Sequence, residues 1–250
     1  MSQTPQMTTD GVQQNGSPAT VDDQIDPNVS IQYWNDVPAN AGGMLAMLGQ
    51  YPWYSRIDLR GSKSFLAKVR RMVPSCTTEG KLAQGVDCGA GVGRVTEGFL
   101  SQVCQKVDGV EPVEKFTRVM KESALSASGV IGDVYTIGLE DWYPDKKYDL
   151  IWIQFCVGHL KDSQLIDAVI RCRSALTETG IVVVKENMST DPNGEDMFDE
   201  LDSSVTRTDD KFKSIFRGAG MNVVASELQL GFPKNFHLLP VRFYALRPKV

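Results

Sequence analysis

Two strongly apolar runs, separated by a helical pattern, constrain the fold of this chain most. The runs are "YDLIWIQFCV" (148–157) and "GIVVVKE" (180–186), and each has the pattern of a β-strand that is buried on both faces. A helix is predicted between them over Asp162–Leu176. Because a helical crossover returns the chain to the same end of the sheet, the two strands should be parallel. The sequence therefore predicts a doubly wound α/β fold.

The same alternation continues on both sides of this unit. Three further strands are predicted near Leu82–Asp87, Val107–Glu111 and Val134–Gly138, with helices over Val92–Cys104 and Val113–Ala124. A helix should also begin at Ser62 or Ser64, and another should cover Asp209–Ala219. The late segments "MNVVASELQL" and "VRFYALRP" are expected to form an antiparallel pair at one edge of the sheet.

The 250 residues, of which 42% are hydrophobic, suffice for one large domain with a sizeable core. Residues 1–28 are predicted to be a disordered acidic tail, because they are polar, lack aromatics and contain four aspartates but no Lys, Arg or Glu. Residues 29–75 are predicted to be a helical and aromatic extension that covers the active site. Residues 76–250 then form the α/β domain.

The cysteines and the N-terminus indicate a reducing compartment. The five cysteines are scattered and form no CxxC pair, so we expect reduced thiols, no disulfides and no metal site. The chain lacks the features of a secretory signal or a transit peptide. It also has no apolar run near the roughly 20 residues that a membrane helix needs. We expect a cytoplasmic protein that also enters the nucleus.

A glycine-rich loop, "DCGAGVGR", follows the first predicted strand. In a doubly wound sheet the ligand binds beyond the carboxyl ends of the strands, and this turn lines the crevice. Gly89, Gly91 and Gly93 would let the main chain approach a ligand closely. Such a loop is shared by proteins that bind nicotinamide, flavin or S-adenosylmethionine, so its context has to discriminate among them.

Arg94 supplies that context, because a dinucleotide loop would carry glycine at its position. An arginine can instead pair with the carboxylate of the methionine part of S-adenosylmethionine, while Asp87 would lie close to its ammonium group. Glu111, at the end of the second strand, could accept hydrogen bonds from two ribose hydroxyls. The alternatives are a nicotinamide oxidoreductase, or a tight turn in which these side chains bind nothing.

Candidate substrate groups follow the fourth and fifth strands. Gln154, Phe155 and His159 come after the fourth strand, although a single His near apolar neighbours is often only a packed residue. The group after the fifth strand consists of Asn187, Asp199, Asp202 and Ser204. Its acidic character would suit a cationic substrate.

Taken together, Tyr33-Trp34, "GAGVGR", "DLIWIQFCVGHL", "KEN" and "DSSVTR" resemble the protein α-N-terminal methyltransferases that act on X-Pro-Lys starts. The resemblance runs in order from about residue 31 to the end. It implies a Rossmann-like class I methyltransferase fold with a mostly parallel seven-stranded sheet and an antiparallel edge. It also implies S-adenosyl-L-methionine as cofactor, held at positions Gly89, Gly91, Arg94, Glu111, Pro112, Val113, Leu139, Glu140 and Gln154. Leu139 and Glu140 would lie along the adenine edge.

For the peptide, the resemblance implies that Asn187 holds the leading residues and that Asp199, Asp202 and Ser204 meet the lysine. Trp34 and Phe155 would line the channel that the peptide enters. The chain departs from the family at Phe155, where Trp is usual, and at Ala46, Met47 and Leu48, which replace a short glycine-rich stretch. These departures leave open the preference for the first substrate residue and the number of methyls transferred.

The implied reaction is an in-line methyl transfer to a deprotonated α-amino group. An α-amino group has a pKa of roughly 7.7 to 8.0, so an acceptor for its proton helps near neutral pH. The candidate catalytic residues are His159, Asp202 and Asn187, and the sequence does not rank His159 against Asp202.

The expected partners are N-terminal tails of protein substrates, bound by a monomer. Four of the five net negative charges lie in residues 1–28, and "KVRR" is the only dense basic cluster of the remainder, so nucleic acid is disfavoured. Membrane binding is not expected. Two alternatives are left: a methyltransferase for a small-molecule amine, and a non-catalytic cofactor-binding protein.

Overall fold

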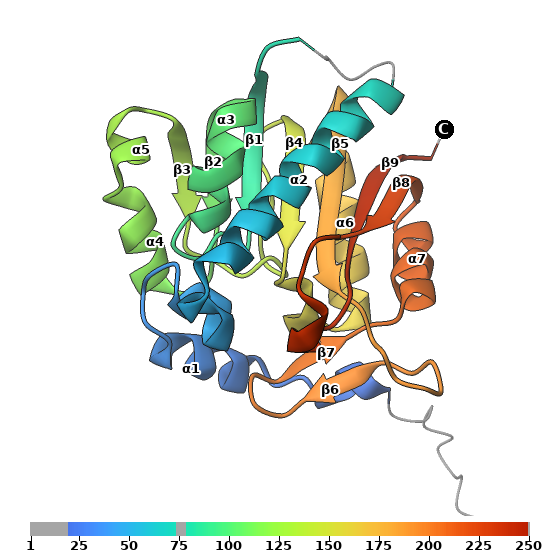
Figure 1. Ribbon diagram of the computed structural model, residues 1–250. Helices are drawn as coiled ribbons and strands as arrows, with labels where there is room; N and C mark the ends of the chain where they lie inside the picture. Colours follow the sequence, from blue (N-terminus) through green and yellow to red (C-terminus); the bar gives the residue numbers. More distant parts are fainter. Residues whose placement is uncertain (1–19, 74–78, 250) are drawn as a thin grey trace, which may run out of the picture.

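The computed structural model describes residues 20–73 and 79–249, and its centre is a seven-stranded sheet (Figure 1). The strands, in the order β3-β2-β1-β4-β5-β9-β8, are parallel from β3 to β5, and β9 runs antiparallel to both of its neighbours. Their bounds are β1 Leu82–Cys88, β2 Cys104–Val110, β3 Ile131–Tyr135, β4 Tyr148–Gln154, β5 Leu176–Asn187, β8 Met221–Leu228 and β9 Val241–Pro248. The predicted mostly parallel sheet with an antiparallel edge is confirmed.

Helices cover both faces of this sheet. The helical elements are η1 Val21–Gln24, α1 Pro27–Asp36, η2 Gly43–Gln50, α2 Pro52–Met72, η3 Thr96–Leu100, α3 Ser101–Val103, α4 Glu114–Lys121, α5 Ala124–Ala127, η4 Val157–His159, α6 Asp162–Ala175, α7 Asp209–Gly218 and η5 Lys234–Phe236. Among the described residues, no helix is both long and apolar enough to cross a membrane.

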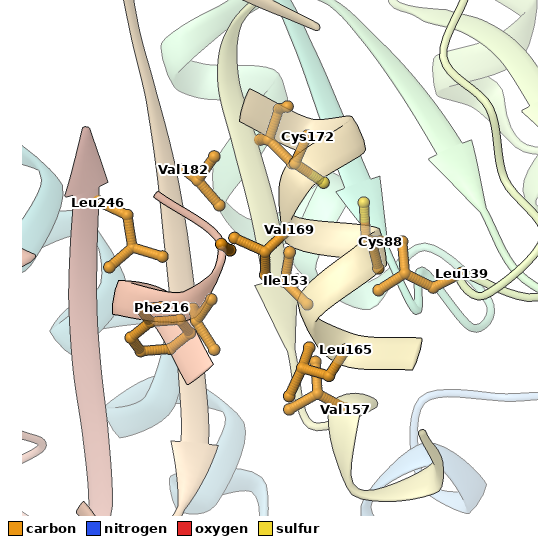
Figure 2. Packing of buried hydrophobic residues seen from close by; sticks show 14 of the residues in the cluster. Cys88, Leu139, Ile153, Val157, Leu165, Val169, Cys172, Val182, Phe216 and Leu246 are labelled. Atoms are coloured by element: carbon orange, nitrogen blue, oxygen red, sulfur yellow. The ribbon is translucent and has the colours of Figure 1, made fainter. Parts of the chain in front are cut away.

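Alternate residues of each central strand point to opposite layers, which explains the continuous apolar runs. Ile151 and Ile153 of β4 pack in one layer with α6 and α7, and Figure 2 shows Ile153 beside side chains of α6. Leu150 and Trp152 of the same strand pack in the other layer with α2 and η3.

Helix α2 begins earlier than predicted. Its start is at Pro52, a residue that is favourable in the first turn of a helix because it lacks an N–H, and not at Ser62 or Ser64. Ser62 lies inside the helix, where its hydroxyl donates to the carbonyl of Asp58 over 3.1 Å. From the sequence alone, a serine inside a helix that donates to the preceding turn looks the same as a serine that caps the start of a helix. The start of α2 was therefore predicted too late in the chain.

Two further differences lie near the ends of the strands. Strand β3 ends at Tyr135, before the predicted Gly138, because Gly138 begins a turn in which its carbonyl accepts from Asp141 N–H. The segment predicted as a loop after β5 contains a two-stranded hairpin of β6 Met197–Asp199 and β7 Ser204–Thr206. In Figure 1 this hairpin lies with α1 beyond the carboxyl ends of the parallel strands.

The last part of the predicted disordered tail, residues 20–28, is ordered in the structure. Asp22 accepts a hydrogen bond from the N–H of Asp162 at the start of α6 (2.8 Å), and Asp26 caps α1. Ile25 is buried. Aspartates that suggested a solvated tail therefore serve as helix caps. The prediction for residues 1–19 lies outside the described residues, as do the predicted boundary at 75–76 and Cys76.

Candidate active site

The glycine loop after β1 has the backbone conformation that the sequence predicted. Gly89, Gly91 and Gly93 have φ values of +71°, +55° and +85°, a region that favours glycine. The N–H of Gly89 donates to the carbonyl of Val110 (2.9 Å), which ties the loop to the end of β2. A Cβ on Gly89 would lie 2.5 Å from Cβ of Cys156, so glycine is also required there for space.

A pocket opens at this loop and joins residues from five parts of the chain. They are the loop itself, the ends of β2 and β4, the turn after β3, and the helical extension before β1. Its lining contains the predicted residues Gly89, Gly91, Arg94, Glu111, Pro112, Val113, Leu139, Glu140, Gln154, Phe155, His159 and Trp34. The structure thus brings most of the predicted cofactor positions and three predicted substrate residues to one cavity.

Arg94 lies in the pocket wall and is held by the preceding helix α2. Its Nη1 donates to Oδ2 of Asp58 over 2.8 Å and to Oγ of Ser55 over 3.3 Å. Gln154, also in the wall, donates from Nε2 to the same Asp58 carboxylate (3.1 Å) and accepts from Trp152 at Oε1 (2.9 Å). Both predicted cofactor residues are therefore fixed by buried partners.

Glu111, the predicted ribose-binding residue, lines the pocket and is held by two backbone N–H groups. Its two carboxylate oxygens accept the N–H groups of Gly91 and Val113, each over 2.9 Å. An ionised carboxylate has about four lone-pair sites, so capacity for hydroxyl donors is left. Burial raises the pKa of Glu111 to about 7, against the lowering effect of these two hydrogen bonds. A cofactor hydroxyl that donates to this carboxylate would favour its ionised form.

The structure does not place Asp87 in the pocket lining, where the sequence analysis expected it beside an ammonium group. Its side chain is only 1% exposed and accepts a hydrogen bond from Thr96 Oγ1 (2.7 Å). Burial raises the pKa of Asp87 to about 6. Asp87 therefore fastens the start of the helix behind the loop to the strand, and an effect on a ligand would be indirect.

His159 also lines the pocket, and both of its ring nitrogens are hydrogen-bonded to α1. Trp34 Nε1 lies 3.1 Å from Nε2, and Ser30 Oγ lies 3.2 Å from Nδ1. An indole N–H can only donate, so Nε2 accepts and the proton of the neutral ring is on Nδ1. The Ser30 hydroxyl donates in turn to the carbonyl of Asp202 (2.9 Å). Burial lowers the pKa of His159, and this outweighs the opposing effect of Asp202.

The remaining predicted substrate residues do not line the pocket itself. Asp199 is exposed, whereas Asp202 has a buried Oδ1 without a hydrogen-bond partner among the described residues. Ser204 begins β7, beside η4, which carries His159. Asn187 ends β5 next to buried Glu186, whose Oε1 accepts its N–H. The Asp199–Ser204 hairpin is connected to the pocket through Ser30 and His159.

Two residues near the predicted substrate channel have an unusual backbone. Phe155 and Ser203 both have φ of +54°, which is costly for residues with a Cβ. The N–H of Phe155 donates to the carbonyl of Lys185 (3.1 Å), and Ser203 Oγ accepts from the N–H of Asp26 (2.8 Å). These contacts hold a strained conformation at the two segments that flank His159.

Three residues that build the site have no counterpart in the sequence analysis: Ser30, Asp58 and Lys185. A signal was available for Lys185, because a lysine inside the buried strand "GIVVVKE" needs an anionic partner. No such signal marked Ser30 or Asp58. Within the described residues, no group of three or more His, Cys, Asp and Glu is placed to hold a metal ion.

The Trp34–His159 contact predicts a small pKa change in Trp34→Phe. Removing the indole donor takes away a hydrogen bond to the neutral ring, so the pKa of His159 should rise, by up to about one unit. The chain contains only two histidines, His159 and His237, so nitrogen NMR of the imidazoles can follow both and His237 serves as the internal control. An Nε2-protonated ring in the parent protein would contradict the assignment.

Comparison with known proteins places this site in context. A profile for the AdoMet-dependent proline dimethyltransferases matches residues 22–247. The chain is 43% identical to the α N-terminal protein methyltransferase 1 of Schizosaccharomyces pombe, over 88% of this chain and 94% of that protein. It is 37% identical to the N-terminal Xaa-Pro-Lys N-methyltransferase 1 of Xenopus tropicalis, over 82% and 89%. A solved SAM-dependent methyltransferase of Leishmania major superposes with a TM-score of 0.77 at 31% identity, over 90% of this chain and 86% of that one.

Proposed function

The chain belongs to the family of AdoMet-dependent proline dimethyltransferases, and from this premise we propose its reaction. It transfers methyl groups from S-adenosylmethionine to the free α-amino group of proteins that begin Xaa-Pro-Lys once the initiator Met has been removed. The observation that carries the proposal is a single pocket that contains both the glycine loop and the α1 residue Trp34, together with His159. A cofactor and an amine could meet there.

The chain's own residues would orient the reactants and remove a proton. S-adenosylmethionine, when bound, supplies an electrophilic methyl group on a sulfonium. Arg94 would bind the carboxylate of this cofactor and Glu111 its ribose hydroxyls, and Trp34 and Phe155 would line the approach of the peptide. In-line displacement needs the amine lone pair at about 3 to 3.5 Å from the methyl carbon. The amine must therefore be neutral.

We propose Asp202 rather than His159 as the proton acceptor. Nε2 of His159 already accepts from Trp34, and its Nδ1 carries a proton directed at Ser30, so neither nitrogen offers a free lone pair. Asp202 has an oxygen with no hydrogen-bond partner in the described part of the chain. His159 would then orient the segment through Ser30, and Asn187 would hold the first residues of the peptide.

Mass spectrometry of a Ser-Pro-Lys peptide after incubation with the protein and S-adenosylmethionine tests the reaction. We expect mass gains of one to three methyls on the α-amine, and none when that amine is acetylated. A Ser-Pro-Gln peptide should react with a kcat/KM at least about tenfold lower, because Asp199 loses its cationic partner. Transfer to free small amines but to no peptide would favour the small-molecule alternative.

We further propose a monomer that acts in the cytoplasm and the nucleus and binds neither nucleic acid nor membranes. The support is compositional, since four of the five net negative charges lie in residues 1–28 and the remainder is close to neutral. Light scattering after size exclusion and microscopy of the tagged protein test this proposal. A dimer, or retention on nucleic acid or vesicles, would overturn the corresponding part.

A further inference from the structure

One carboxylate organises a buried ionic cluster that contacts two residues of the pocket lining. Asp58 of α2 is fully buried, and so is Lys185 of β5, whose Nζ donates to Asp58 Oδ1 and, over 3.0 Å, to its backbone carbonyl. The same carboxylate accepts from Arg94 Nη1 (2.8 Å) and Gln154 Nε2 (3.1 Å). Neither Asp58 nor Lys185 lines the pocket, whereas Arg94 and Gln154 do.

This arrangement uses only part of the hydrogen-bonding capacity of Arg94. A guanidinium has five N–H donors in a fixed fork, and two adjacent donors can bind one carboxylate. Within residues 20–73 and 79–249, the hydrogen bonds of Arg94 to Asp58 and Ser55 both leave from Nη1, so Nη2 and Nε donate to no protein group. The Arg94 side chain is 9% exposed and lines the pocket, so a ligand there could contact these donors. A second carboxylate would complete its hydrogen bonds.

Burying two cations requires a fixed counter-charge, and Asp58 is the carboxylate that pairs with both. Burial lowers the pKa of Lys185 to about 8, and Asp58 acts against this lowering. Without Asp58, Arg94 would keep only the longer hydrogen bond to Ser55 of α2 (3.3 Å) and would gain rotamer freedom, so binding a ligand would require ordering it again. The helix before the α/β core would thus set the geometry of a cofactor contact in that core.

We propose that Asp58 is a positioning residue for the amino-acid half of the cofactor, which holds Arg94 so that its remaining donors bind the ligand carboxylate. This inference rests on the proposed function, in which Arg94 binds that carboxylate. It differs from a general structural role, because Asp58 should matter for ligands that carry the carboxylate and not for ligands that lack it.

Calorimetric titration of the full chain with two ligands tests this difference. S-adenosylhomocysteine contains the amino-acid half, and 5′-methylthioadenosine is the corresponding nucleoside thioether without it. In Asp58→Asn, the Kd of S-adenosylhomocysteine should rise at least tenfold, while the Kd of 5′-methylthioadenosine should change less than twofold. Equal losses for both ligands, or no loss for either, would overturn the proposal.

Two further variants separate this effect from destabilisation. Asp58→Asn leaves Lys185 buried without its anion, so Asp58→Asn/Lys185→Met, which removes both charges, should fold better and retain the same ligand selectivity. Asp108→Asn is the matched control, because Asp108 is also fully buried and pairs with a lysine, Lys146 (2.9 Å), away from the pocket lining. Its thermal stability should fall while the ratio of the two Kd values stays unchanged. A changed ratio in Asp108→Asn would contradict a specific role for Asp58.

The titration of the parent protein distinguishes a failure of the proposed function from a failure of the inference about Asp58. If the parent binds neither ligand, the proposed function and this inference both fail. If the parent binds both ligands and Asp58→Asn binds S-adenosylhomocysteine as tightly, only this inference fails.

Discussion

Asp202→Asn is expected to lower kcat by more than tenfold at neutral pH. The change keeps the size of the side chain but removes the negative charge that would accept the proton of the α-amine. General-base assistance contributes about 10²–10⁴ in rate, so its loss should exceed any effect of altered packing. The affinity for S-adenosylmethionine should change little, because Asp202 is not among the residues that line the cofactor pocket. Single-turnover rates and calorimetric titration measure the two quantities separately.

The pH dependence of Asp202→Asn provides a stricter check. An α-amino group with a pKa of roughly 7.7 to 8.0 loses its proton to solvent as the pH rises above that range. The variant should therefore recover part of its rate between about pH 7 and pH 9, whereas the parent should gain less. Asp199→Asn is the matched control, since Asp199 is exposed and lies in the same hairpin. It should raise KM for the peptide and largely preserve kcat. Unchanged turnover in Asp202→Asn would remove Asp202 from the mechanism.

The sequence could predict the sheet because each central strand carries its own evidence. Both faces of β4 and β5 are buried over "LIWI" and "IVVV". Every residue in these two stretches is therefore apolar, and the burial can be predicted from the stretch itself. The glycine loop was predictable for a similar reason, because positive φ and close approach both require residues without a Cβ. These are local constraints, and they are visible in a local stretch of sequence.

The parts of the site that the sequence did not reveal depend on distant partners. Lys185 and Asp58 are 127 positions apart, and His159 and Ser30 are 129 apart. Nothing in the local pattern of α2 distinguishes Asp58 from a solvated aspartate on a helix. Asp22 shows the same limit, because the N–H of Asp162 that it caps is 140 positions away, whereas the Asp26 cap of α1 is a local signal that the sequence analysis missed. The prediction from composition therefore assigned the ordered residues 20–28 to the disordered tail.

Arg94→Ala is expected to weaken the binding of S-adenosylmethionine about thirtyfold. A charge-assisted hydrogen bond contributes roughly 1.5 to 3 kcal/mol, and about 2 kcal/mol corresponds to this factor. The fold should tolerate the change, because Asp58 keeps Lys185 and Gln154 as partners. Arg118→Ala is the control, since the Arg118 side chain is 63% exposed and pairs with Glu114 on the surface of α4. An unaltered Kd in Arg94→Ala would show that the carboxylate binds elsewhere.

The combination of Arg94→Ala with Asp58→Asn then separates binding from positioning. If Asp58 acts on the cofactor through Arg94, it has nothing left to position once Arg94 is gone. The double variant should therefore bind S-adenosylhomocysteine no more weakly than Arg94→Ala alone, so the two effects are not additive. Arg94→Lys should recover only part of the affinity, because a lysine keeps the charge but lacks the fork that binds two carboxylate oxygens together. Fully additive losses would mean that the two residues reach the ligand independently.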